Sequence, residues 1–152
     1  MKKYEFTGET KRVELWNRTA TLHRIKATVE FGFVKVGELG GWIEKEENLS
    51  HEGKAWVWGN AEVWGNAKVC GDAEVFLASH VLVMGSVGSR NDFTTFFRDK
   101  DNEITVKCGC FLGKIDKFLE KVTQTHGNNK YALVYRAAVE VAKLQIELTE
   151  RK

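Results

Sequence analysis

Residues 53–88 decide the fold prediction, because they divide into six consecutive units of six residues: GKAWVW, GNAEVW, GNAKVC, GDAEVF, LASHVL and VMGSVG. The fifth position of every unit is valine, at Val57, Val63, Val69, Val75, Val81 and Val87. The third position is always small, at Ala55, Ala61, Ala67, Ala73, Ser79 and Gly85. The first four units begin with glycine, and three of these continue with Asn60, Asn66 or Asp72, as is typical of tight turns. This sustained period predicts short strands that are joined by corners and stacked on one another.

The period resembles the hexapeptide repeat of left-handed parallel β-helices, in which three units complete one coil. The resemblance implies the left-handed path and about two coils, with Val57 stacked on Val75, Val63 on Val81 and Val69 on Val87. The expected fold class is mainly β with C-terminal helices (α+β). We expect an N-terminal strand cap at 1–52, a short left-handed parallel β-helix at 53–88, and a β-hairpin plus two helices at 89–152.

Large apolar side chains alternate with the valines and are expected on the outside of this thin stack: Trp56, Trp58, Trp64, Phe76 and Leu82. An apolar surface of that extent usually marks an interface. The N-terminal strands, the C-terminal segment or another subunit should cover it. We therefore expect a homo-oligomer, either a trimer or a dimer of trimers.

The N-terminal flank contains short strands with glycine turns and leads directly into the repeat. Its segment LHRIKATVEFGFVKVGELGGWIEKEENLSHEG (22–53) resembles the N-terminal cap of a group of bacterial and phage hexapeptide-repeat proteins, which are uncharacterised or classed as transferases. The likeness is carried by LHRI (22–25), GGWIE (40–44) and NLS (48–50).

The C-terminal flank predicts a hairpin followed by two helices. The strand-like runs GSRNDFTTFFR (88–98) and EITVKCGCF (103–111) are separated by DKDN (99–102), a plausible turn. A first helix is predicted from the spacing of Ile115, Phe118, Leu119 and Val122, with a stop at His126-Gly127. A second helix is apolar over more than one stripe, which indicates burial on several sides by packing or oligomerisation.

Three strings in this flank, GSRNDFTTFFR, VKCGCFLG (106–113) and THGNNKYA (125–132), resemble phage and prophage proteins of unassigned function. The segment is also similar to phage anti-defence proteins that sequester the nucleotide signals of Thoeris immunity in oligomers. The resemblance implies a phage-type anti-defence protein that sequesters a small nucleotide-derived immune signal without catalysis. That signal would be of the cyclic ADP-ribose type or a cyclic oligonucleotide.

The candidate ligand site combines cations, hydroxyl and amide groups with an aromatic ring. Residues 89–152 contain 12 basic and 9 acidic side chains, which suits a small anionic nucleotide better than a nucleic-acid duplex. Arginine and lysine pair with phosphate, and an aromatic face stacks on a base. The predicted ligand-binding residues are Arg90, Asn91, Thr94, Phe97, Arg98, Thr105 and Lys107, with Arg136 from a neighbouring subunit and Arg24. The alternative is a hairpin whose phenylalanines are core and whose charges are solvated.

Two other features suggest alternative chemistry. His80, the one histidine of the repeat, could act as the general base of an acyltransferase-like hexapeptide-repeat enzyme. Cys108 and Cys110 could serve metal or redox chemistry, but strand alternation favours small core residues on one face with Ile104 and Val106. We assign no catalytic residue, metal or cofactor, and a purely structural oligomerisation module is a third possibility.

Composition and charge limit the compartments and partners that we expect for this protein. The chain has 152 residues, a net charge of +2, three cysteines and no proline. An odd cysteine count without framework spacing favours a reducing compartment. Because no apolar segment is long enough to span a membrane, we expect no membrane partner. The expected location is the cytoplasm, that of the host cell if a phage encodes the protein.

Overall fold

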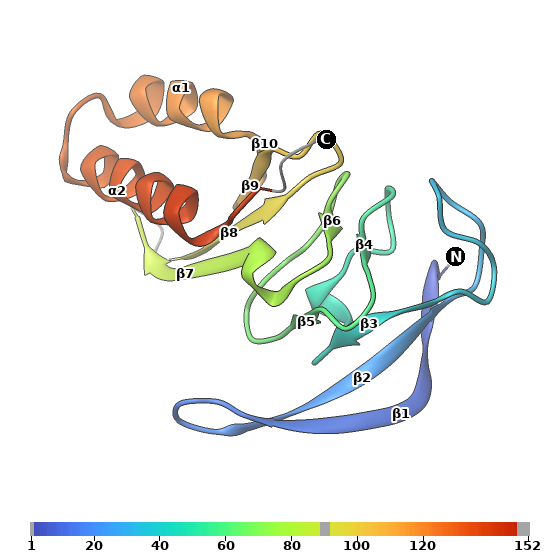
Figure 1. The fold of residues 1–152 in the computed structure, drawn as a ribbon. Helices are drawn as coiled ribbons and strands as arrows, with labels where there is room; N and C mark the ends of the chain where they lie inside the picture. The colour runs from blue at the N-terminus through green and yellow to red at the C-terminus, as the bar shows by residue number, and fades with distance from the viewer. Residues whose placement is uncertain (1, 89–91, 149–152) are drawn as a thin grey trace.

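The structure, a computed structural model that describes residues 2–88 and 92–148, is a mixed α+β fold with three sheets and two helices (Figure 1). The first sheet has the order β1-β2-β3-β5. Its strands are β1 (Tyr4–Glu14), β2 (Thr19–Ala27), β3 (Leu39–Ile43) and β5 (Glu62–Val63). The first three strands are antiparallel, and β5 adds in parallel to β3.

Residues 39–76 form a two-layered parallel stack, the name used below for this region. Strand β4 (Trp56–Val57) pairs in parallel with β6 (Glu74–Val75), and a parallel bridge joins Leu49 to Val69. The inward side chains are almost fully buried: Ile43, Leu49, Val57, Val63, Val69 and Val75. The corner glycines Gly59, Gly65 and Gly71 have positive φ, as the repeat predicts for tight turns.

The predicted left-handed parallel β-helix is wrong as the fold class. One large sheet is antiparallel and four-stranded, and the parallel pairs are confined to the short stack instead of forming one long solenoid. Val57 does pair with Val75, but Val63 pairs with Ile43 and Val69 bridges to Leu49. Val81 and Val87 lie in the antiparallel strand β7 (Val81–Val87).

The physical reason lies in the fifth and sixth units, which keep the valine but lack the Gly-Asn or Gly-Asp corner. A 3₁₀ turn, Ala78–His80, replaces the corner and is fastened by His80, whose Nδ1 accepts hydrogen bonds from the backbone N–H groups of Phe76 and Leu77. The chain then runs straight through VLVMGSV, a run suited to a longer strand. That strand pairs with β8 (Asp92–Arg98) rather than continuing the stack.

The antiparallel sheet has the order β10-β9-β8-β7 and packs between the helices and the parallel stack (Figure 1). Its remaining strands are β9 (Ile104–Cys108) and β10 (Phe111–Lys114). Helices α1 (Ile115–His126) and α2 (Lys130–Gln145) cover one face. Phe96 belongs to the core beneath these helices, whereas Phe97 belongs to the core of the stack. Because successive side chains of a strand point to opposite faces of the sheet, β8 contributes to both cores.

Several local predictions for the C-terminal flank are confirmed. Strands β8 and β9 form the expected hairpin, and Asn102 in its turn has a φ of 57°. Helix α1 ends at His126 with Gly127 at positive φ. The domain boundaries stay predictions, although strand pairs between β3 and β5 connect residues on both sides of residue 52.

The large side chains expected outside the stack are mostly covered by the same chain. Trp56 is only 1% exposed and packs against Tyr4 and Phe31. Trp64 packs against the buried cluster of Ala20, Leu22 and Trp42 in the N-terminal sheet. Among the described residues, neither helix has the length and apolar composition that a membrane span requires.

Candidate functional site

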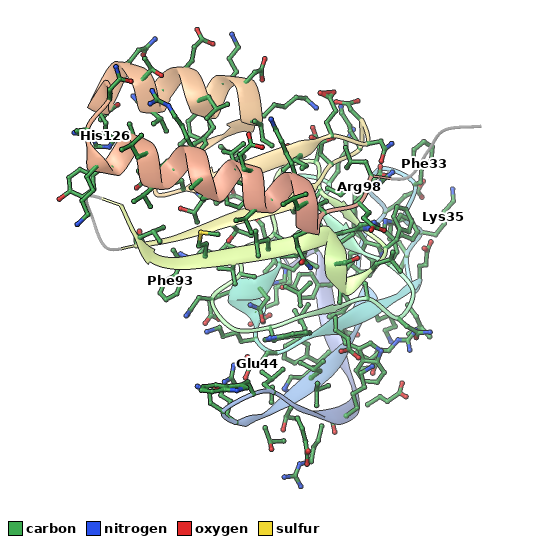
Figure 2. The ribbon with its side chains drawn as sticks, turned by 60° about the vertical axis from the view of Figure 1, so that its left-hand side comes forward. Phe33, Lys35, Glu44, Phe93, Arg98 and His126 are labelled. Atoms are coloured by element: carbon green, nitrogen blue, oxygen red, sulfur yellow. The ribbon has the colours of Figure 1, made fainter. Side chains whose placement is uncertain are left out.

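The predicted site residues do not converge in the structure. Arg90 and Asn91 lie outside the described residues. Figure 2 shows Arg98 and Phe93 at opposite ends of β8, so the predicted cluster is divided between the two ends of the sheet.

Arg98 is a buried link between the stack and the hairpin turn. Its Nη1 donates to the Glu74 carbonyl oxygen at 3.1 Å, and its Nε donates to Asn102 Oδ1 at 3.0 Å. The guanidinium also lies over the Phe76 ring, 5.1 Å from its centroid. These contacts engage the guanidinium group that is predicted to bind phosphate, so the structure gives Arg98 a structural role.

Three further predicted residues are buried in the protein. Phe97 is a core side chain. Thr105 Oγ1 donates to Asp99 Oδ2 at 2.7 Å, and Thr94 Oγ1 donates to Cys108 Sγ at 3.3 Å. For these residues the alternative of a hairpin with core phenylalanines describes the structure better than a ligand site.

The two outlying arginines also make internal contacts. Arg136 Nη2 donates to the Gly127 carbonyl oxygen at 2.9 Å and so caps the end of α1. The Arg24 guanidinium lies 5.2 Å from the centroid of the Trp42 ring, in the N-terminal sheet. Neither residue lines the cavity that contains Lys107.

Lys107 does line a cavity, of about 550 Å³, between the antiparallel sheet and a corner of the parallel stack. The sheet contributes Lys107, Phe93 and Thr95, and the stack contributes Lys45 and Lys68. The cavity also includes the following residues: Glu47, Gly65, Asn66, Ala67, Asp92, Gly109 and Cys110. This cavity, called the lysine cavity below, is the candidate functional site.

The lysine cavity is lined by three lysines and two acidic residues. Within residues 2–88 and 92–148, Lys45 and Lys68 form no ion pair. Lys107 Nζ donates to the Gly109 carbonyl oxygen at 2.6 Å, and an ammonium has two further protons to donate. Three cations from three different segments give this surface the chemistry of an anion site.

A buried asparagine holds the stack side of the cavity. Asn48 is 0% exposed, and its Nδ2 donates to the carbonyl oxygens of Gly65 at 3.1 Å and Ala67 at 2.9 Å. Its Oδ1 accepts from the backbone N–H groups of Glu44 and Lys45. Asn48 therefore fixes Lys45 and the Gly65 corner relative to each other.

Glu44 holds the same corner from the other side. Its Oε1 accepts from the Gly65 N–H at 2.9 Å, and its carboxylate accepts hydrogen bonds from Nη1 and Nη2 of Arg18. The Arg18 hydrogen bonds lower the pKa of Glu44 to about 2, and the Gly65 N–H adds to this effect. The corner is thus held by a carboxylate that stays ionised at neutral pH.

Phe93 forms the aromatic part of the cavity wall. A Cβ placed on Gly85 would lie 2.4 Å from Phe93 Cδ1, so the ring can pack across β7 only because residue 85 is glycine. Thr95 connects the two sides, because its Oγ1 accepts from the Lys68 N–H at 3.0 Å.

A second, mainly apolar cavity of about 350 Å³ adjoins the lysine cavity on the helix side. The two cavities share Asp92, Gly109 and Cys110, and the second is walled by Phe111 and Phe118. Cys110 is exposed where they meet, in the turn between β9 and β10. Its predicted place in the core is therefore wrong, whereas Cys108 is half-buried beside the helix core. In the described part of the chain, no three metal-ligating side chains come together.

His80 has the wrong setting for the general base of an acyltransferase. It is 2% exposed, and its Nδ1 accepts from two backbone N–H groups. Burial lowers its pKa, and the nearby Arg98 charge lowers it further. The contacts give His80 a structural role in the turn that ends the repeat.

Comparisons with protein-family models and with curated proteins find no match to this chain. The resemblances to hexapeptide-repeat and Thoeris anti-defence proteins accordingly stay predictions. Of the predicted ligand residues within the described chain, only Lys107 lines the lysine cavity. Sequence alternation could have added Lys68, because it lies between the inward positions Ala67 and Val69 of its unit. No comparable signal marks Lys45, which reaches the site through tertiary folding.

Proposed function

We propose that the protein binds a small anionic ligand of the nucleotide class in the lysine cavity and releases it unchanged. The observation that carries this proposal is the convergence of Lys45, Lys68 and Lys107 on one cavity. Phosphate groups are the natural partners of such a set, since each ammonium offers several charge-assisted hydrogen bonds.

The size of the cavity and its aromatic wall support a nucleotide over a bare inorganic anion. About 550 Å³ is within the range of small-molecule sites, and it exceeds what one phosphate fills. Phe93 is 37% exposed and presents part of its ring for stacking on a base. Asn66 adds a polar side chain at the same cavity for hydrogen bonds to a base edge or a ribose.

The biological role proposed for this binding is sequestration of a nucleotide-derived immune signal, as the anti-defence resemblance implies. An acyltransferase is the alternative, but the burial of His80 and its backbone hydrogen bonds argue against that histidine as a base. A purely structural module is the other alternative, and it gives no reason for three lysines to converge on one cavity.

Calorimetry with cyclic ADP-ribose isomers and cyclic oligonucleotides tests the proposal. We expect saturable binding of at least one ligand by the wild type, and a loss of affinity of about tenfold in Lys68→Ala, equal to about 1.4 kcal/mol. Lys117→Ala removes an exposed lysine of α1 that lies outside the lysine cavity and is the matched control. If the wild type binds none of these ligands, the proposal is wrong.

Two further measurements separate binding from chemistry and locate the site. Ligand recovered after denaturation should have an unchanged mass, whereas an altered mass would indicate an enzyme. Because Cys110 lies at the rim of the cavity, bound ligand should slow its alkylation by iodoacetamide, with Cys110→Ser identifying the labelled position. Binding that leaves the Cys110 reaction rate unchanged would place the ligand elsewhere.

A further inference from the structure

The outer face of α2 carries an apolar stripe made of Leu133, Ala137, Val141 and Leu144. Leu133 is 60% exposed, Val141 is 43% exposed and Leu144 is 82% exposed. At 100° per residue, the four positions fall within about 80° of one another around the helix axis. An isolated exposed leucine is ordinary, but a continuous stripe of this kind is typical of a helix that has a partner.

The stripe is not the side on which α2 packs within its own chain. The buried side chains of the helix are Ala132, Tyr135, Ala138, Val139 and Ala142. They face the antiparallel sheet, and the same helical geometry places the stripe on the opposite side. Helix α2 therefore has one apolar face that packs in the core of its own chain, and the stripe is a second apolar face.

The charges beside the stripe indicate what covers it. Glu140 and Lys143 lie on one flank, where they form an ion pair within α2 at 3.6 Å, and they are equally distant in sequence from the midpoint between residues 141 and 142. If a second α2 crosses antiparallel at that midpoint, each Glu140 meets the Lys143 of the other copy. The pairing occurs twice because a two-fold interface repeats every contact.

The apolar residues fit the same arrangement. About the same midpoint, Val141 and Leu144 of one helix alternate along the axis with the Val141 and Leu144 of the other, so that side chains interdigitate instead of colliding. Ala137 and the Leu144 of the second copy also fall at neighbouring heights, and the small alanine leaves room for the leucine. The charges and the C-terminal part of the stripe, formed by Ala137, Val141 and Leu144, are therefore self-complementary, whereas Leu133 lies beyond the end of the second α2, which ends at Gln145.

We infer that the stripe binds a second copy of this chain, giving a two-fold dimer in which the α2 helices pack antiparallel. This interface is independent of the lysine cavity, which lies on the other face of the antiparallel sheet. Dimer formation and ligand binding can therefore fail separately.

Light scattering coupled to gel filtration tests the dimer. At high micromolar concentration, the wild type should have twice the 17.3 kDa mass of the chain. Leu144→Glu should give the monomer mass, whereas Leu39→Glu, at a 52% exposed leucine of the N-terminal sheet, should stay dimeric. Circular dichroism of each variant at the same concentration confirms that the fold is kept.

A charge exchange tests the antiparallel register. Glu140→Lys and Lys143→Glu should each weaken the dimer several-fold by placing like charges together, and the double exchange should restore it. A monomeric wild type, a trimer mass, or a dimer unaffected by Leu144→Glu would overturn the proposal. A dimer that the double exchange does not restore would overturn the register.

Discussion

The parallel stack and the antiparallel sheet lie side by side, yet they are held together by different means. Strands β4, β5 and β6 of the stack have two residues each, whereas β7 and β8 of the sheet have seven. Such short strands make few ladder hydrogen bonds, so the stack depends on its valine column and on buried polar side chains at its corners. The sheet depends on a continuous backbone ladder.

The comparison teaches what a valine repeat does and does not specify. Val63 and Val87 occupy the same position of their units, but Val63 lies inside the stack and Val87 lies at the end of a long strand. The difference arises at the corners, because the first four units begin with a glycine at positive φ (Gly53, Gly59, Gly65 and Gly71), whereas the last two units do not begin with glycine. The valine period predicts strands, and the corner residues decide how the strands are joined.

The largest expected effect comes from placing a charge at the two equivalent valines. Val63→Asp puts a carboxylate in the core of the stack, where Val63 is 2% exposed, and should cost about 4 kcal/mol or more of unfolding free energy. Val87→Asp, at a half-buried position, should cost less than half as much. Urea unfolding followed by tryptophan fluorescence measures both. Equal losses would show that the two valines have equivalent surroundings.

An intermediate effect is expected from the polar support of the stack. Asn48→Ala removes hydrogen bonds to two carbonyl oxygens and two N–H groups and should cost about 2–3 kcal/mol. The matched change in the sheet, Thr94→Val, removes one weak hydrogen bond to Cys108 and should cost less than about 1 kcal/mol. The same urea experiment compares them, and a sheet variant as unstable as the stack variant would contradict this account.

Much of the local structure could be predicted from the sequence, but its assembly could not. The glycine corners, the hairpin turn and the stop of α1 each depend on residues close together in the chain, such as Gly65 and Gly127. The fold class was predicted wrongly because strand partners are a tertiary choice. Residues 81–87 could continue a stack or pair with β8, and the phenylalanine-rich β8 provides the longer ladder.

The candidate site was predicted less well for a related reason. Arginines near the hairpin were chosen for their charge, but Arg98 and Arg136 use that charge on carbonyl oxygens within the fold. The lysines of the cavity come from segments that are distant in sequence, and only Lys107 lies in residues 89–152, the segment with the excess of basic side chains. Composition locates charge in the chain, whereas tertiary packing decides which charges stay free for a ligand.

The smallest expected effect is the pH dependence of stability that comes from the Arg18–Glu44 ion pair, which supports the Gly65 corner. Because Arg18 holds the pKa of Glu44 near 2, below its ordinary value of 4.5, the folded protein keeps this carboxylate ionised at acidities where the unfolded chain binds a proton. The stabilisation is present above pH 4.5 and is lost as the pH falls toward 2. Arg18→Gln should therefore lower the unfolding free energy at pH 7 only slightly, since solvent screens the exposed Arg18 side chain. The gap between variant and wild type should narrow as the pH falls to 2, where Glu44 of the wild type is about half protonated. Urea midpoints of the two proteins at both pH values measure that gap, and a gap of equal size at pH 2 would show that Arg18 stabilises the corner by packing and not by its charge.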